Sequence, residues 1–346
     1  PEKRFPTRRD IDAVTGGRPT ILTRADGHAL LANTAALRLA GIDGEPASQP
    51  DGGRIEVDAQ GLPTGMLIDN AMGPLAGIAQ APTTDEIYQA YEKGDAREIR
   101  LGWTGVHNMS VPGDHIARIT ALSDSGKLKL RIWNAIDGED FDSASFGTST
   151  EGRVTTKAIK LYMDGALGSR GALLSAPYSD QPETTGLQRA HEDETLALLK
   201  KAYDADIQVS FHAIGDEGNR TVLDWMEKTF ATAGGANKRW RIEHAQILHV
   251  DDIPRFKQLG VVASMQPSHA IGDLYFASAR LGPERLAGAY AWRSLIDAGA
   301  IVAGGSDAPV EVADVLEGIA VAISRTDAAG EPAGGWQASG VVRRET

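Results

Sequence analysis

Residues 207–247 read IQVSFHAIGDEGNRTVLDWMEKTFATAGGANKRWRIEHAQI, and the chain from about residue 84 onward follows the same pattern. The stretch opens with a β-rich apolar run, continues with a helix-period segment at 218–233, and closes with a second β-rich run at 241–247. Strand, helix and strand in this order are typical of a parallel βα unit. Apolar residues continue through both runs instead of alternating with polar ones, which indicates strands that are buried on both faces.

The same alternation extends in both directions, with helix-period segments such as 83–100, 193–205, 251–260 and 293–299 between short β-rich runs. Parallel strands that alternate with helices predict an α/β fold, a (β/α)8 TIM barrel that is one strand short of closure. The runs that we predict to be strands are 104–109, 130–136, 158–164, 207–214, 241–247, 261–267 and 301–307.

Residues 1–83 do not continue the alternation. They contain a stretch that predicts a helix, ALLANTAALRLAGI (29–42), and then a Gly-rich stretch, GGRIEVDAQGLPTGMLID (52–69). The second stretch reads as a β-hairpin over the turn Asp58–Gly61. We interpret 1–83 as an α+β insertion or subdomain beside the barrel, 84–325 as barrel strands 2 to 8 with their helices, and 326–346 as a truncated tail.

Composition limits the classes of partner. The chain has 346 residues, 42% of them hydrophobic, and a formal net charge of −12, which argues against nucleic acid or an anionic membrane surface as a partner. It contains no cysteine, so disulfides, thiolate metal sites and a cysteine nucleophile are excluded. No apolar run approaches the roughly 20 residues of a membrane span. We expect a small-molecule substrate and a cytoplasmic rather than a periplasmic location, and a homo-oligomer stays open.

Four residues of ligand type stand at or near the ends of predicted strands: Lys160, His212, His244 and Asp307. Each has an ordinary explanation, because a strand-end histidine is often only hydrogen-bonded and an aspartate after Gly-Gly-Ser is often a helix cap. Lys160 is harder to dismiss, since a lysine within a barrel strand is costly to desolvate unless it is paired. Catalytic groups of (β/α)8 enzymes gather at the carboxyl ends of the strands, so the four together predict a functional site.

The order Lys, His, His and Asp on these strands resembles the amidohydrolase superfamily. Longer strings are similar to its family 3 branch, the group that includes N-substituted formamide deformylases. The similarity runs from about residue 20 to about residue 325. The strings that carry it are DGHALLANTAALRLAGI (26–42), KLYMDGALGSRGALL (160–174), SFHAIGDEGNRTVLD (210–224), RIEHAQ (241–246), SMQPSHAIGD (264–273) and GGSDAPV (304–310).

The resemblance implies a metal-dependent hydrolase that cleaves a non-peptide C–N bond of amide or formamide type with a metal-activated water. It implies one or two divalent ions, with zinc favoured, bound by Lys160 as a carbamate and by His212, His244 and Asp307. Asp307 would also be the catalytic residue that moves a proton from the water to the leaving nitrogen.

Four further residues are weaker candidates for substrate binding, and an ordinary structural role is equally expected for each of them. They are His28, Asp164, Arg170 and His269. The remaining histidines we interpret as surface or structural residues, namely His107, His115, His191 and His249.

One element of the family pattern is absent, a His-x-His on the first barrel strand. The predicted barrel also lacks one strand, and the chain starts abruptly at Pro1. We therefore expect the natural polypeptide to begin before Pro1 with a β-rich segment and that strand. We also expect it to continue past Thr346 into the rest of a small β-sandwich.

Three alternatives stay open at this stage. The same metal centre could cleave an ester, a cyclic imide or a phosphotriester, because fold does not fix function. The chain could instead be a metal-free, non-catalytic scaffold in which the His-x-His was never present. A periplasmic binding protein would agree with the cysteine-free composition, but it leaves the ligand-type residues at the strand ends unexplained.

Overall fold

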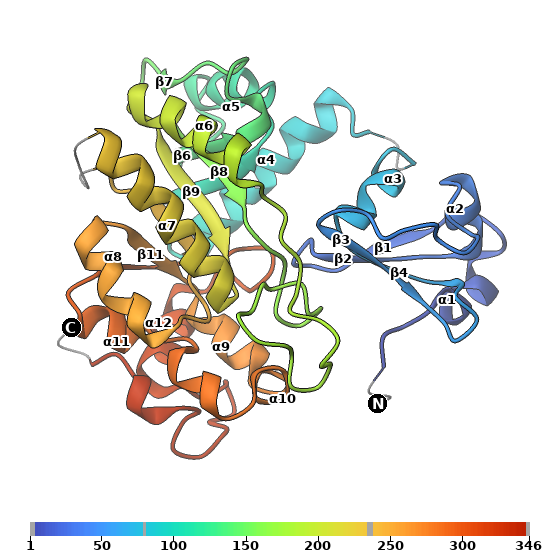
Figure 1. The fold of residues 1–346 in the computed structure, drawn as a ribbon. Helices are drawn as coiled ribbons and strands as arrows, with labels where there is room; N and C mark the ends of the chain where they lie inside the picture. The colour runs from blue at the N-terminus through green and yellow to red at the C-terminus, as the bar shows by residue number, and fades with distance from the viewer. Residues whose placement is uncertain (1–3, 79–80, 234–237, 344–346) are drawn as a thin grey trace.

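A computed structural model describes residues 4–78, 81–233 and 238–343 of the chain. Its centre is a curled sheet of parallel strands, coloured from cyan to red in Figure 1. The parallel strands are β5 (Gly105–Val111), β6 (Arg131–Asp137), β8 (Val154–Tyr162), β9 (Gln208–Ala213), β10 (Arg241–His244), β11 (Val262–Met265) and β12 (Ile301–Gly304).

The strands follow one another in the sheet in chain order, from β5 to β12, and every neighbouring pair is parallel. A short strand, β7 (Gly147–Thr148), pairs with β8 in the antiparallel sense. All seven predicted strands are therefore present, and the prediction of a TIM-barrel-type α/β fold is confirmed. Within the described ranges, no further strand pairs with the outer edges of β5 and β12.

Helices before, between and after the strands surround this sheet (Figure 1). They are α4 (Thr84–Arg100), α5 (His115–Asp124), α6 (Glu192–Asp204), α7 (Asp216–Ala233), α8 (Ile253–Leu259), α11 (Trp292–Asp297) and α12 (Val315–Ser324). Two more, α9 (Pro267–Asp273) and α10 (Ala277–Leu281), follow β11. Short 3-10 turns lie at η1 (Asn70–Met72), η2 (Gly138–Asp140), η3 (Val250–Asp252), η4 (Glu284–Gly288) and η5 (Ala338–Gly340).

Local sequence signals set several of these boundaries. Helix α4 begins with a capping box, in which Thr83 Oγ1 accepts from the Glu86 N–H at 3.3 Å and Glu86 accepts from the Thr83 N–H at 2.7 Å. Helix α8 ends on Gly260, whose φ of 64° lies in the left-handed region that favours glycine. All described residues of β10 and β11 are buried, as expected for strands covered on both faces.

The N-terminal part forms a separate antiparallel sheet, shown in blue in Figure 1. Its strands are β1 (Ile21–Thr23), β2 (Ala29–Ala32), β3 (Gly53–Val57) and β4 (Pro63–Asp69), in the order β1-β2-β4-β3. Strands β3 and β4 pair across the turn at 58–61, so the predicted hairpin is confirmed. Helices α1 (Arg8–Thr15), α2 (Thr34–Leu39) and α3 (Gly73–Ala76) accompany the sheet.

The predicted helix over 29–42 is wrong in its first third. Residues Ala29–Ala32 form the buried strand β2, which is paired on both sides, and the helix begins only at Thr34. The Asn33 side chain accepts from the Ala36 N–H at 2.9 Å and so caps the helix. Two strand partners and full burial outweigh the helix propensity of Ala and Leu in this segment.

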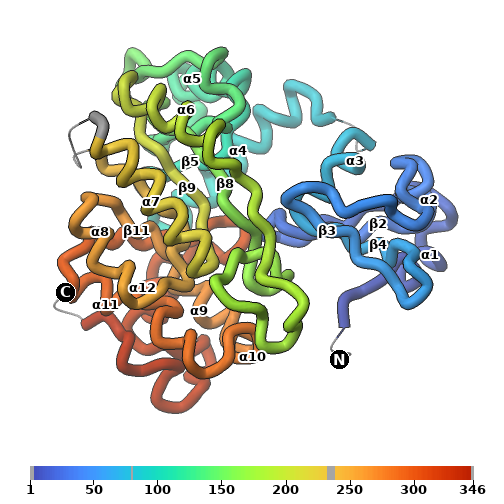
Figure 2. The backbone as a smooth tube through the Cα atoms, viewed as in Figure 1, coloured from blue at the N-terminus to red at the C-terminus, as the bar shows by residue number. Residues whose placement is uncertain are grey.

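The long loop between β8 and α6 lies on the side of the barrel that faces the N-terminal sheet (Figure 2). Arg54 of β3 donates to the backbone oxygen of Ser169 in this loop at 2.8 Å. Arg189, further along the loop, donates to Asn70 Oδ1 at 3.1 Å. These hydrogen bonds hold the N-terminal sheet close to the carboxyl ends of the barrel strands.

None of the helices in the described ranges combines the length and the apolar character needed to cross a lipid bilayer.

Candidate functional site

Two histidines stand next to each other at the carboxyl ends of neighbouring strands. His212 is the fifth residue of β9, and His244 is the last residue of β10. Their ring centroids lie 4.6 Å apart, with the planes at 70°. Parallel pairing places both strand ends at one edge of the sheet, which is why residues 32 positions apart meet.

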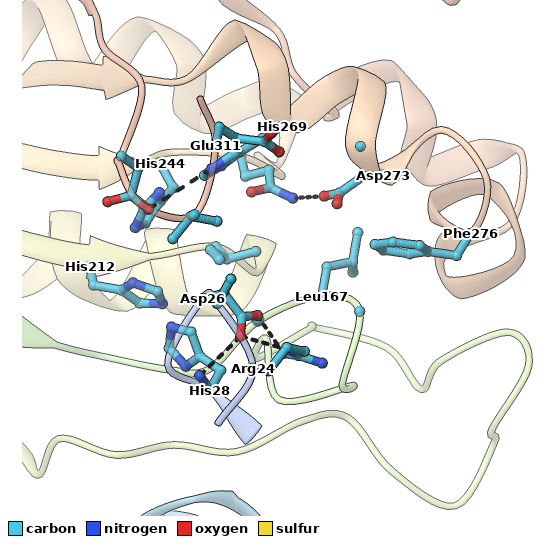
Figure 3. A pocket seen from close by; sticks show the side chains of 18 residues that line it. Arg24, Asp26, His28, Leu167, His212, His244, His269, Asp273, Phe276 and Glu311 are labelled. Carbon is cyan, nitrogen blue, oxygen red and sulfur yellow. Dashed lines mark hydrogen bonds and ion pairs between the residues drawn. The ribbon is translucent and has the colours of Figure 1, made fainter. Parts of the chain in front are cut away.

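Two cavities converge on this pair. The first, of about 380 Å³, opens towards helix α9 and the loop after β8, and its walls include His269 and Asp273. The second, of about 590 Å³, lies between the edge strands β5 and β12 and includes Lys160. Six residues line both cavities: Asp26, His28, His212, His244, Asp307 and Val310. Figure 3 shows how the labelled side chains, among them His28, His212 and His244, gather around the first cavity.

The cavity walls carry a row of four imidazoles. The His28 ring lies 4.8 Å from that of His212, and His244 lies 5.7 Å from His269, which it meets in a stacked arrangement. His269 stands on α9, directly after β11, whereas His28 comes from the turn between β1 and β2 of the N-terminal sheet. The structure therefore brings together residues from two sheets.

Burial keeps three of these rings neutral, those of His212, His244 and His269. Loss of water contact lowers the pKa of His244 to about 4, with a further contribution from the charge of Lys160. Loss of water contact and then the neighbouring His244 lower the pKa of His269 to about 4. The pKa of His212 is also lowered well below the ordinary value, for the same first reason. Neutral imidazole is the form of histidine that binds metal ions.

Lys160 is almost completely buried within β8 and lies against the aromatic side chain two residues later. Its Nζ lies 3.7 Å from the centre of the Tyr162 ring, so part of the charge is stabilised by a cation–π contact. The positive charge of Lys160 also lowers the pKa of His244, although desolvation has the larger effect on that pKa.

Asp307 follows β12 by three residues, and its φ of 56° lies in the left-handed region. One carboxylate oxygen, Oδ2, lies 3.9 Å from His269 Nε2. Loss of water contact raises the pKa of Asp307, and the adjacent His269 opposes this rise. The backbone conformation is unfavourable for a residue with a Cβ, and such conformations concentrate at functional sites.

The donor types around His212 and His244 fit a divalent cation, because the two neutral imidazoles lie edge to face at the wall of both cavities. His212 Nε2 is buried without a hydrogen-bond partner among the described residues, with Asp164 Oδ1 3.4 Å away. The described ranges contain no group of three or more His, Asp or Glu side chains that are already arranged to hold an ion. The residues that could bind a cation are thus the imidazole pair, together with Lys160 and Asp307 in the wall of the second cavity.

Two of the weaker candidates do not reach the cavities. Asp164 is fully buried and accepts hydrogen bonds from the backbone N–H groups of Leu173 (2.8 Å), Ile214 (3.0 Å) and Gly215 (2.8 Å). The carboxylate thus joins the loop after β8 to the end of β9, and its Oδ1 lies 3.4 Å from His212 Nε2. Substrate binding by Asp164 stays a prediction.

Arg170 likewise lines neither cavity. It binds Asp180 through Nε at 3.1 Å and Nη2 at 2.8 Å. A loop residue that finds an acidic partner ten positions later has a structural explanation, so its proposed substrate contact is not supported by its position.

Sequence reasoning missed several residues of the cavity walls. Asp26, Asp273 and Glu311 line the first cavity. Asp26 and Asp273 stand within the strings DGH and HAIGD, so the signal was present but was not interpreted. His107, interpreted as a surface or structural residue, lines the second cavity and accepts from Arg241 Nη1 at 2.6 Å.

Comparison with known proteins agrees with this arrangement. The whole chain, residues 1–346, matches the family model described as the amidohydrolase family, in its third branch. The chain is 36% identical to the putative amidohydrolase YtcJ of Bacillus subtilis, over 92% of its own length and 61% of that protein. It is 28% identical to the N-substituted formamide deformylase of Arthrobacter pascens, over 96% of its length and 63% of that protein.

A solved structure shows the same fold. The chain superposes on an uncharacterized metal-dependent hydrolase from Pyrococcus horikoshii with a TM-score of 0.73 and 28% identity, over 93% of this chain and 63% of the other. The chain thus spans less than two thirds of the length of these relatives. The match to the family model over all 346 residues and the fold establish that the chain belongs to amidohydrolase family 3.

Proposed function

We propose that the protein hydrolyses a small molecule at a non-peptide C–N bond of amide or formamide type, with water activated by a divalent metal ion, zinc foremost. The observation that carries the proposal is the pair of neutral imidazoles, His212 and His244, 4.6 Å apart at the carboxyl ends of two parallel strands. Both cavities reach this pair, so a substrate has access to it.

His212 and His244 would hold the ion, with Lys160 as a carbamate and Asp307 as further ligands. A bound divalent ion supplies an acidified water and polarises a carbonyl oxygen. Lys160 would serve as a ligand only as the carbamate, which is anionic and offers two oxygens, because an ammonium group would repel a cation. The 6% exposure of Lys160 gives a charged amine little solvation and favours its conversion to a partnered anion.

Asp307 would transfer the proton. Hydrolysis needs a base that takes a proton from the attacking water and an acid that delivers one to the leaving nitrogen, and one carboxyl group performs both roles in turn. The raised pKa of Asp307 favours the second role, because a weaker acid holds the proton until the nitrogen accepts it. His269, 3.9 Å from Asp307, would orient this carboxylate or contact the substrate.

The choice of a C–N bond rests on likeness to the N-substituted formamide deformylase, at 28% identity. The same site chemistry would serve an ester, a cyclic imide or a phosphotriester, and these are the alternatives to the proposal. A metal-free, non-catalytic role is the alternative of a different class.

The test is metal analysis of the complete gene product, followed by a panel of formamides, secondary amides, cyclic imides, esters and phosphotriesters. We expect bound zinc and turnover of amides or formamides. His244→Asn should lose both, whereas His249→Asn, a matched substitution outside both cavities, should keep both. Turnover of esters alone would show that the protein cleaves esters and not C–N bonds. Protein that binds no metal and turns over no substrate would support the metal-free, non-catalytic role.

A further inference from the structure

His28 belongs to the N-terminal sheet but lies in the barrel site. It stands in the turn between β1 and β2, in which the Gly27 N–H donates a hydrogen bond to the backbone oxygen of Arg24. Its ring faces that of His212 with the centroids 4.8 Å apart and lines both cavities. Figure 3 shows the His28 ring next to His212, on the side of the cavity formed by the N-terminal sheet.

Asp69 holds this ring in place. Its Oδ1 lies 2.6 Å from His28 Nδ1, and the Asp69 side chain is completely buried. Asp69 ends β4, and β4 pairs with β2, the strand that begins directly after His28. The hydrogen bond therefore joins two neighbouring strands, and the N-terminal sheet fixes the orientation of the imidazole.

The backbone of Asp69 adopts an energetically unfavourable conformation. Its φ of 49° and ψ of −124° lie outside the regions that residues with a Cβ normally occupy. Two residues of the loop after β8 leave room for the carboxylate, because a Cβ at Gly165 or Gly171 would collide with Asp69 Oδ2. Strain of this kind persists where the surrounding structure enforces it, and it concentrates at functional sites.

The contact also fixes the tautomer of His28. A carboxylate only accepts hydrogen bonds, so Nδ1 carries the proton in this contact, and in a ring with a single proton the Nε2 lone pair is left free. No described residue forms a hydrogen bond with His28 Nε2. The ring thus presents a hydrogen-bond acceptor, held by Asp69, to a cavity that can admit a small molecule.

We propose that His28 Nε2 accepts a hydrogen bond from an N–H group of the substrate, with Asp69 as its positioning residue. This inference rests on the proposed amide-type function and specifies its substrate class. A secondary amide or formamide has an N–H to offer, whereas its N-methylated counterpart has none. The N-terminal sheet would therefore select substrates that carry an N–H beside the bond to be cleaved.

A matched pair of ligands tests the selection: a secondary amide and the same molecule methylated on nitrogen. In the wild-type full-length protein, kcat/KM should favour the secondary amide by about ten-fold, the value of one hydrogen bond. His28→Asn keeps an N–H donor for Asp69 but removes the cavity-facing nitrogen, so the preference should fall below about three-fold. His28→Gln, whose longer amide can present its oxygen to the cavity, should recover part of it.

Two readouts separate this inference from the proposed function. If neither amide is cleaved, calorimetric Kd values for the same pair give the preference directly, and a preference lost in His28→Asn supports the inference although the proposed reaction fails. A preference that is unchanged in His28→Asn overturns the inference whatever bond is cleaved. Bound metal should be equal in wild type and variant, and loss of metal would identify His28 as a ligand instead.

The tautomer is tested without any ligand. In chelator-treated protein with 15N-labelled histidine, the His28 signal, assigned by its loss in His28→Asn, should report a protonated Nδ1 and an unprotonated Nε2. Asp69→Asn removes the carboxylate charge and should shift the ring towards a mixture of tautomers. A ring protonated on Nε2 in the wild-type protein would overturn the proposal.

Discussion

The Nδ1–H of His244 donates a hydrogen bond to Oε1 of Gln266, over 2.9 Å. Gln266 follows β11, so the ring at the end of β10 is oriented by the next strand in the sheet. With its proton on Nδ1, the ring keeps the Nε2 lone pair available to a ligand. Outer partners of this type fix the tautomer and the direction of metal-binding histidines.

Gln266→Leu should therefore weaken metal binding. The substitution removes the acceptor for His244 Nδ1–H and leaves the ring free to rotate, and loss of such a partner typically costs about 10–100-fold in metal affinity. Competition with a metal chelator measures the change. Gln266→Glu retains an acceptor oxygen and should stay within about ten-fold of wild type. Equal affinity in the Leu variant would show that Gln266 does not orient His244.

Asp164→Ala should destabilise the fold strongly. The substitution leaves three buried backbone N–H groups, of Leu173, Ile214 and Gly215, without their acceptor. An unsatisfied buried donor costs about 1–3 kcal/mol, so we expect a loss of several kcal/mol in the free energy of unfolding. Urea denaturation measures it, with Asp142→Ala, at an exposed ion pair with Lys201, as the control.

A different result would support substrate binding by Asp164. If Asp164→Ala unfolds at the same urea concentration as wild type but raises KM alone, the carboxylate contacts substrate after all.

The barrel and the core of the site could be predicted because both follow from local pattern. Each β-rich run predicts a strand, and the parallel arrangement brings the strand ends together. His212 and His244 therefore meet without any knowledge of side-chain packing. Local pattern does not indicate where the side chain of Asp164 lies, although this residue also follows a strand end, because its carboxylate accepts from backbone N–H groups and lines neither cavity.

The contribution of the N-terminal sheet could not be predicted from local pattern. His28 and Asp69 are 41 positions apart, and His28 meets a barrel residue still further along the chain. These contacts depend on how two sheets pack against each other, which periodicity does not encode. Strand pairing also explains why the helix predicted at 29–42 begins only at Thr34, since Ala29–Ala32 form β2, which lies between β1 and β4.

Activity should depend on dissolved carbon dioxide if Lys160 acts as a carbamate. Metal-free protein reconstituted with zinc in CO2-free buffer should recover little hydrolysis, and addition of bicarbonate should restore it, because the ammonium form repels the cation. Lys160→Met removes the reactive amine and should abolish the bicarbonate effect. Full activity in CO2-free buffer, with Lys160→Met equally active, would exclude the carbamate.

The free energy of unfolding of the metal-free protein should depend on pH through His269 between about pH 6.5 and about pH 4. Burial lowers the pKa of His269 in the folded state to about 4, whereas the unfolded chain has the ordinary value of 6.5. Between these values the unfolded state binds more protons, so acidification favours unfolding. His269→Gln has no such group, and the wild-type protein should therefore lose free energy of unfolding relative to this variant as the pH falls from 6.5 towards 4.

The slope of that difference should not exceed about 1.4 kcal/mol per pH unit, the value for one proton. Urea denaturation of both proteins in chelator at several pH values measures it, and the comparison cancels the opposing contributions of Asp164 and Asp273, whose pKa values burial raises to about 7 and about 6. A difference that does not change with pH would mean that His269 is protonated in the folded protein. His269 would then be cationic next to Asp307, and its role beside that carboxylate would be an ion pair rather than a neutral contact.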